Sequence, residues 1–322
     1  MKFPNHFNFT QPDTPITPFE KFFKHKFKKK IWLKRDDLTG LELSGNKVRK
    51  LDFLLARAVN EGCDHLITCG GIQSNHCRTT AFYAAKLGLK STLVLKGEVP
   101  DKLEGNFLLN TLAGAEIKFV TPEEYKNVET IMEQIATNHS GKSFIIPEGG
   151  SNDTGAWGYL KCFLEIQRQF ENMQQPLDTI VFATGSGGTH AGLLAAKLLQ
   201  KSRINIISVN VCDNAAFFKN KITSIINTLA KNYHMDIKCA ETDVHIIDGF
   251  AGAGYGVVSE KEIEIISRLA KTEGILIDPV YGAKALYGFE TSLEKGKIPG
   301  EHILFIHTGG VFGLFPYGQY FE

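Results

Sequence analysis

The sequence predicts an α/β fold built from two open, twisted, parallel-rich sheets with helices on both faces. Three observations support this prediction. Helical and strand-like segments alternate from about residue 46 to the end of the 322-residue chain, which is typical of α/β proteins. The strand-like runs are continuously apolar, as expected for parallel strands covered by helices on both faces. Nine such runs are too many for one modest open sheet, so two sheets are expected.

The expected helices have apolar residues at helical spacing and recognisable ends. The helix at 47–60 carries one apolar face and stops at Gly62. The helix at 74–87 has Ser74 as its N-cap and Gly88 as its stop. Further helices are expected at 103–112, 123–137, 156–170, 188–200, 260–271 and 284–293.

The expected strands are short runs rich in β-branched residues. They lie at 65–69, 91–95, 117–120, 144–146, 179–182, 204–211, 245–247, 275–277 and 303–306. Glycine turns follow several of them, at 70–71, 149–150, 185 and 309–310. Ligands of parallel sheets bind beyond the carboxyl ends of the strands. The four turns therefore predict one shared cleft, although glycine also serves simply to end a strand.

The composition limits the partners that the protein can have. The formal net charge is +1, which favours neither nucleic acid nor an acidic membrane. The six cysteines lack C-x-x-C spacing, so neither a disulfide framework nor a zinc site is indicated and a reducing cytosol is the simple inference. The histidines show no metal-binding spacing, and no run resembles a signal peptide or a membrane span. We expect a cytoplasmic protein with a small-molecule ligand and no metal.

A glycine-rich turn links the strand at 179–182 to the helix at 188–200. It consists of Thr184, Gly185, Ser186, Gly187, Gly188 and Thr189. Such a turn exposes backbone N–H groups at the positive end of a helix dipole, where they can bind phosphate. It is not a P-loop, because no Gly-Lys-Ser/Thr follows. It comes close to a dinucleotide fingerprint, with Asp213 in the place of the ribose-binding acid, but His190 replaces the third glycine. A NAD-binding oxidoreductase is the alternative from another class.

Lys47 stands among small polar residues where the helix at 47–60 begins, beside Arg49 and Lys50. A lysine is more often a solvated charge than a nucleophile. Nearby positive charge, however, lowers the pKa of a lysine amine and favours Schiff-base chemistry. A lysine and a phosphate site together match the aldehyde and phosphate ends of pyridoxal phosphate.

Two further segments have competing interpretations. Residues 70–76 place Ser74, Asn75 and His76 at a helix N-terminus. They form either an ordinary cap or a carboxylate site made of backbone N–H groups and a hydroxyl. Residues 21–35 interleave basic and aromatic side chains, a pattern also found at nucleic-acid or membrane contacts. Because charge is balanced elsewhere, a solvated helix face leading into a strand is the preferred interpretation.

Together these motifs resemble the D-cysteine desulfhydrase and 1-aminocyclopropane-1-carboxylate (ACC) deaminase family of fold-type II, tryptophan-synthase-β-like pyridoxal phosphate enzymes. The resemblance covers about residues 12–318. It is carried by residues 31–38, 44–51, 70–76, 183–188, 255–256, 278–281 and 307–310. It implies a homodimer whose large domain comprises residues 1–48 and 152–322, with a small domain at 49–151.

The resemblance implies which residues bind the cofactor. Lys47 would attach it as a Schiff base. Asn75 would hydrogen-bond its ring hydroxyl, and Thr308 would lie beside its pyridine nitrogen. Lys50 and the turn at 184–189 would hold its phosphate.

The resemblance also implies how an amino-acid substrate is bound. Ser74, with the backbone N–H groups of Asn75 and His76, would bind the substrate carboxylate. Tyr255 and Tyr281 would face the substrate as acid–base or positioning groups.

Two positions bear on the identity of the substrate. ACC deaminases of this family carry Glu after the second tyrosine and Leu before the Gly-Gly pair, whereas this chain has Gly282 and Thr308. Thr308 matches the desulfhydrases, and Gly282 matches neither group. A carboxylate beside the pyridine nitrogen would strengthen the electron sink needed to open a cyclopropane; a threonine hydroxyl suits expulsion of a thiolate. We therefore expect β-elimination of D-cysteine to pyruvate, hydrogen sulfide and ammonia. ACC deamination is the first alternative, and a noncatalytic binding protein of the same fold is another.

Overall fold

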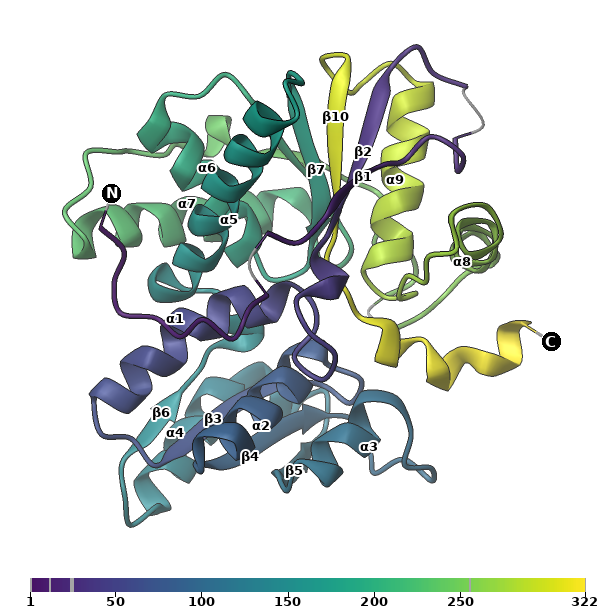
Figure 1. The fold of residues 1–322 in the computed structure, drawn as a ribbon. Helices are drawn as coiled ribbons and strands as arrows, with labels where there is room; N and C mark the ends of the chain where they lie inside the picture. Colours follow the sequence, from purple (N-terminus) through teal and green to yellow (C-terminus); the bar gives the residue numbers. More distant parts are fainter. Residues whose placement is uncertain (1, 12, 24–25, 255, 322) are drawn as a thin grey trace.

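The computed structural model describes residues 2–11, 13–23, 26–254 and 256–321, arranged around two sheets (Figure 1). The six-stranded sheet has the order β1-β2-β10-β7-β8-β9, and the four-stranded sheet the order β5-β4-β3-β6. β1 runs antiparallel to β2, and every other pairing between described strands is parallel. The strands are β1 (Ile16–Pro18), β2 (Lys30–Arg35), β3 (His65–Gly71), β4 (Lys90–Lys96), β5 (Glu116–Val120), β6 (Ser143–Ile145), β7 (Thr179–Thr184), β8 (Asn205–Asn210), β9 (His245–Ile247) and β10 (His302–His307).

Helices cover both faces of both sheets, which confirms the predicted fold class. On the large sheet, alternate side chains of β7 and β10 pack against α5, α6 and α7 on one face and against α8 and α9 on the other. On the small sheet, α2 and α3 cover one face and α4 the other. The helices are α1 (Asn46–Asn60), α2 (Asn75–Leu87), α3 (Gly105–Leu112), α4 (Val128–Asn138), α5 (Asp153–Asn172), α6 (Gly188–Gln200), α7 (Ala215–Asn232), α8 (Glu260–Glu273) and α9 (Gly282–Glu294).

Every expected helix is present, and every expected strand except one. The prediction of a strand at 275–277 is wrong. Ile275 and Ile277 are buried, but Leu276 is 46% exposed and its carbonyl accepts a hydrogen bond from the His307 side chain rather than from a neighbouring strand. This stretch is an extended connection between α8 and α9. α7 was not predicted, although its buried side chains recur at helical spacing.

The prediction of a solvated helix face within residues 21–35 is also wrong. Residues 21–23 form a turn, and a strand, β2, follows at Lys30–Arg35. Phe22 and Phe23 are buried, and the ring of Phe23 packs edge-on against Phe289 of α9. The aromatic residues of this segment therefore belong to the core of the large sheet, and none of its described residues is helical.

α1 begins directly on the carboxyl end of β10. The Asn46 N–H donates to the Thr308 carbonyl over 3.0 Å. Gly45 has φ 95°, and a Cβ there would lie 2.7 Å from the Thr308 oxygen. A Cβ on Gly309 would lie 2.6 Å from the Gly45 Cα. Only glycine permits this approach, so the glycine pair fixes the start of α1, and Lys47 with it, beside Thr308.

A buried ionic network holds the same helix from behind. Arg49 donates to both Asp36 and Glu165, and Lys34 also pairs with Glu165. The Tyr159 hydroxyl donates to Asp36 over 2.6 Å. Burial alone would raise the pKa of Asp36, but the charges of Arg49 and Lys34 and these hydrogen bonds outweigh it and hold the pKa below its ordinary value.

The sheets divide along the chain much as the domain prediction anticipates. The strands of the small sheet lie between residues 65 and 145, and those of the large sheet come from both ends of the chain. The domain boundaries, 1–48 with 152–322 and 49–151, stay a prediction.

We expect Arg49→Met to lower the free energy of unfolding by about 3–5 kcal/mol, because it leaves the buried Asp36 carboxylate without its ion-pair partner and Glu165 with Lys34 alone. Arg57→Met is the matched control. Arg57 lies on the same helix, and its pair with Glu61 is half exposed, so a loss within about 1 kcal/mol is expected. Urea unfolding monitored by circular dichroism measures both. Equal losses in the two variants would contradict the network's role.

Candidate active site

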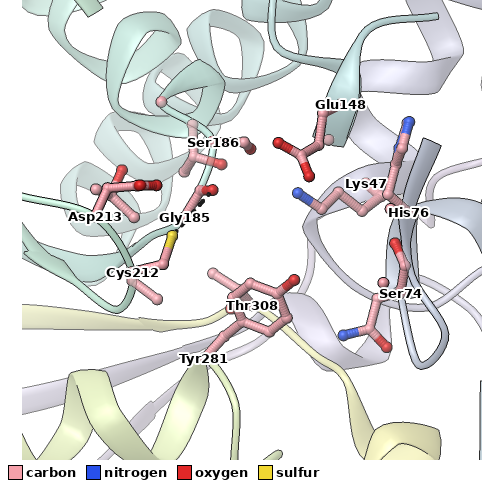
Figure 2. A pocket seen from close by; sticks show the side chains of 18 of the residues that line it. Lys47, Ser74, His76, Glu148, Gly185, Ser186, Cys212, Asp213, Tyr281 and Thr308 are labelled. Atoms are coloured by element: carbon pink, nitrogen blue, oxygen red, sulfur yellow. Dashed lines mark hydrogen bonds between the residues drawn. The ribbon is translucent and has the colours of Figure 1, made fainter. Parts of the chain in front are cut away.

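A cavity of about 770 Å³ lies where the carboxyl ends of the two sheets meet. Glycines from all four predicted strand-end turns line it: Gly70, Gly71, Gly149, Gly185, Gly187 and Gly309. The prediction of one shared cleft is therefore confirmed. Side chains from α1, from the start of α2, from the turn after β10 and from the 3₁₀ turn η3 (Glu148–Gly150) complete the wall (Figure 2).

Lys47 lies in the first turn of α1 and points into the cavity toward Glu148 (Figure 2). Burial of the amine lowers its pKa to about 8, Lys221 adds to the decrease, and the charge of Glu148 opposes it. A Cβ on Gly149 would lie 3.1 Å from the Lys47 Nζ, so the backbone closes directly over the amine. Lys47 is thus a positioned amine that is more readily neutral, and so more nucleophilic, than an ordinary lysine.

The predicted phosphate turn opens α6. Gly187, with φ 87°, is the N-cap of this helix, and the Gly188 N–H donates to the Ser151 Oγ over 3.1 Å. Lys50 donates to the same oxygen and to the Gly149 carbonyl, each over 3.2 Å. Gly185, Ser186, Gly187, Thr184 and Thr189 line the cavity, whereas Lys50 and Gly188 lie behind its wall, covered by Ser151.

These groups fit an anionic ligand. Burial and the neighbouring Lys47 hold the pKa of Lys50 well below its ordinary value. Within the described part of the chain, neither Lys47 nor Lys50 has a carboxylate within ion-pair distance. The buried Thr184 Oγ1 also has no hydrogen-bond partner there. Two buried amines without an ion-pair partner, an unsatisfied hydroxyl and a helix N-terminus suit a phosphate, whose charge would favour the protonated form of the amines.

The start of α2 forms a second polar wall. Ser74 caps the helix by accepting from the Cys77 N–H over 3.2 Å, which leaves its own proton available for donation. The Asn75 Oδ1 accepts from Asn106, so its amide nitrogen is turned toward Gly310. His76 is different. Its Nε2 is 2.8 Å from the Thr68 Oγ1, and burial holds its pKa well below the ordinary value, so the ring is neutral and turned into the fold.

Tyr281 and Thr308 complete the predicted set. The ring of Tyr281 packs against Gly185, where a Cβ would lie 3.0 Å from Cε1. Thr308 follows β10 and lines the cavity. The structure thus brings Lys47, Ser74, Asn75, His76, Tyr281, Thr308 and the turn at 184–189 into one site. Tyr255 lies outside the described residues.

Two acidic residues of the site were not predicted as site residues. Asp278 lines the cavity, and its carboxylate accepts the N–H groups of residues 280, 281 and 282. Burial raises its pKa to about 6. Glu148 directly precedes the glycine turn at 149–150, of which the sequence analysis considered only the glycines. Its carboxylate accepts a hydrogen bond from the Tyr125 hydroxyl over 2.7 Å. An acidic residue directly beside a strand-end glycine turn is the signal that could have identified Glu148.

Two broader features of the described residues bear on function. They contain no cluster of three His, Cys, Asp or Glu side chains that could hold a metal ion. None of their helices combines the length and apolarity that crossing a bilayer requires.

Comparisons with known proteins agree on one family. A family model described as "Pyridoxal-phosphate dependent enzyme" matches residues 8–309. A Thermotoga maritima protein, provisionally named 1-aminocyclopropane-1-carboxylate deaminase, is 42% identical over 307 residues, covering 94% of this chain and 95% of the relative. The mitochondrial bifunctional D-cysteine desulfhydrase/1-aminocyclopropane-1-carboxylate deaminase of Arabidopsis thaliana is 38% identical over 299 residues, covering 88% and 73%. The crystal structure of an ACC deaminase homologue is similar with a TM-score of 0.90 at 34% identity, covering 99% and 95%.

We expect the Lys47 amine to titrate with a midpoint near pH 8 in the full chain freed of bound ligand. Brief acylation with acetic anhydride between pH 6 and 11, followed by mass spectrometry of the Lys47 peptide, measures this midpoint. The exposed Lys102 is the internal reference. A Lys47 that reacts in parallel with Lys102 at every pH would contradict the depressed pKa.

Proposed function

Because this chain belongs to the family of pyridoxal-phosphate-dependent enzymes, we propose that it is a lyase that converts D-cysteine to pyruvate, hydrogen sulfide and ammonia. The observation that carries the choice of substrate concerns position 282. A Cβ at Gly282 would collide with Ile277 and lie 3.0 Å from an Asp278 oxygen, so a glutamate has no room there. Thr308, with its neutral hydroxyl, lines the cavity instead.

The residues of the site divide between the two ends of the cofactor. When bound, pyridoxal phosphate supplies an aldehyde that condenses with amines and a conjugated ring that accepts electrons from the substrate Cα. Lys47 would hold the aldehyde end, and Asn75 and Thr308 would orient the ring. The N–H groups of the turn at 184–189, with Lys50 behind them, would hold the phosphate.

The remaining groups bind the substrate and move its proton. The Ser74 hydroxyl and the N–H groups of Asn75 and His76 would hold the substrate carboxylate at the positive end of α2. The Lys47 amine, once released from the cofactor, is the base that takes the Cα proton at Nζ. Tyr281 would orient the reacting group, and the same role for Tyr255 stays a prediction.

ACC deamination is the second candidate, and one observation favours it. Asp278 places a carboxyl group on the cavity wall although position 282 has none. A carboxylate directed at the pyridine nitrogen would strengthen the electron sink that ring opening requires. The relatives named above also include ACC deaminases.

We also infer that the enzyme is a cytoplasmic homodimer. The homodimer follows from the family resemblance, and the cytoplasmic location from the cysteines, all six of which are unpaired. Light scattering of the purified chain measures its mass in solution, and a monomeric mass would contradict the first inference.

The deciding experiment is pyruvate or 2-oxobutyrate release from D-cysteine, L-cysteine, D-serine and ACC by the purified enzyme. We expect kcat/KM for D-cysteine to exceed that for ACC by about tenfold or more. Borohydride should attach the cofactor to the Lys47 peptide, and Lys47→Ala should abolish turnover because it removes the base. A higher kcat/KM for ACC than for D-cysteine would contradict the argument that no carboxylate acts on the pyridine nitrogen. Asp278 would then be the carboxylate expected to act on it.

Gly188→Val tests the phosphate site. A Cβ at Gly188 would lie 2.9 Å from the Lys50 Nζ and 2.7 Å from the Ser151 Oγ, so the larger side chain must displace the groups behind the turn. We expect cofactor affinity to fall about tenfold or more, or about 1.4 kcal/mol, with an unchanged circular dichroism spectrum. Gly318→Val is the control, since a Cβ there would meet nothing within 4 Å. Retained cofactor affinity together with tight NAD binding would instead favour the dinucleotide alternative.

A further inference from the structure

Glu148 is a cavity carboxylate that the proposed function does not use. It begins η3, directly after Pro147, and its side chain points toward the Lys47 amine (Figure 2). The Tyr125 hydroxyl donates to its Oε1 over 2.7 Å. Tyr125 belongs to the 3₁₀ turn η2 (Glu124–Asn127), which precedes α4. A hydrogen bond from a separate element therefore fixes the direction of this carboxylate although its side chain is exposed.

Lys47 faces titratable or charged groups from several elements. They are Glu148 of η3, Lys221 of α7, Cys212 after β8, Cys77 and His76 of α2, and Lys50 of α1. Burial raises the pKa of Cys212 to about 12 and that of Cys77 still further, so both thiols are neutral. His76 is neutral as well, and the charge of Lys221 lowers the pKa of Lys47. Asp213 and Asp278 also line the cavity, but Glu148 is the carboxylate that acts most strongly on Lys47.

Glu148 and Lys47 do not form a direct ion pair. Within the described residues, no ammonium or guanidinium group lies within ion-pair distance of Glu148. The Lys47 amine is therefore not locked in its charged form and can react as a neutral base. The negative charge nevertheless acts on the buried amine, although water at the exposed carboxylate screens part of it.

We propose that Glu148 is a positioning residue whose charge stabilises the Lys47 ammonium formed when the amine takes the substrate's Cα proton. In this step, which rests on the proposed function, the Cα–H bond breaks and the proton moves to the Lys47 Nζ. The electron pair stays with the substrate carbon and the conjugated cofactor. The charge on Lys47 appears only as the proton arrives, so a fixed negative charge opposite it favours the transition state over the ground state.

The Tyr125 hydroxyl keeps the carboxylate aimed without competing for the proton. Burial, together with neighbouring Cys69 and Glu148, raises the pKa of Tyr125 far above its ordinary value. The hydroxyl therefore stays protonated and donates to Glu148 across the working pH range. Tyr125 and Glu148 therefore provide a fixed charge near Lys47, and they do not carry the substrate proton away.

Glu148→Gln tests the proposal because it removes the charge and keeps the shape. In the full chain freed of cofactor, we expect the titration midpoint of the Lys47 amine to fall by about one pH unit from about 8. The acylation experiment described above measures this midpoint. In the enzyme with bound cofactor, the acid limb of the kcat–pH profile should move to lower pH, and the plateau value of kcat should fall about tenfold. The kinetic isotope effect on kcat with α-deuterated substrate should rise. Added salt should shrink the difference between wild type and variant.

Three further variants separate charge from structure. Glu148→Asp should restore most of the Lys47 midpoint, and Tyr125→Phe should give an intermediate shift because it frees the carboxylate to turn away. Glu133→Gln, an exposed position on α4 outside the cavity, should change nothing. An unchanged Lys47 midpoint and isotope effect in Glu148→Gln would overturn the proposal. Absence of turnover with every amino acid in the wild type would instead overturn the proposed function, while the acylation midpoint still tests the charge.

Discussion

The site depends on the fixed start of α1. Gly45 and Gly309 face each other so closely that neither can carry a side chain, and the Asn46 N–H is bound to the end of β10. One turn further on, Arg49 is held between the carboxylates of Asp36 and Glu165. These contacts fix both the position and the rotation of the helix. The positions of Lys47 over the cavity and of Lys50 behind the phosphate turn follow from that single placement.

The same helix introduces an electrostatic cost that explains why the site needs an anion. Arg49 has two carboxylate partners, but Lys47 and Lys50 have none in the described chain, and burial lowers the pKa of both amines. Desolvated cations without partners destabilise the empty protein. A bound phosphate group removes this penalty and adds the hydrogen bonds of the α6 N-terminus. Binding the cofactor should therefore stabilise the fold as well as supply the chemistry.

The sequence predicted those parts of the fold and site that depend on local pattern. α6 begins and ends at the predicted residues, and its start is marked by the glycine turn that follows the buried strand β7. The strand-end glycines identified the cavity. The segments that failed are those whose structure depends on distant contacts. The stretch 275–277 has strand-like residues but pairs with no strand in the described chain, and in the core Phe22 lies against Arg268 of α8 and Phe23 against Phe289 of α9. Ser151 and Glu148 lie near Lys50 and Lys47 because the chain folds back over α1, and the sequence alone does not show that proximity.

Asp278 bears most directly on the choice between the two candidate reactions. As a free carboxylate on the wall it would favour a protonated pyridine ring. Its two oxygens, however, already accept the N–H groups of Val280, Tyr281 and Gly282 at the start of α9. A carboxylate used in this way stabilises the helix N-terminus and the backbone of Tyr281, and its charge is partly neutralised by that helix dipole. Little of the charge would then be available to a ring nitrogen, and Thr308, if it lies beside that nitrogen as proposed, would offer only a hydroxyl. We infer a moderate electron sink, which is sufficient to expel a thiolate and unfavourable for opening an unactivated ring.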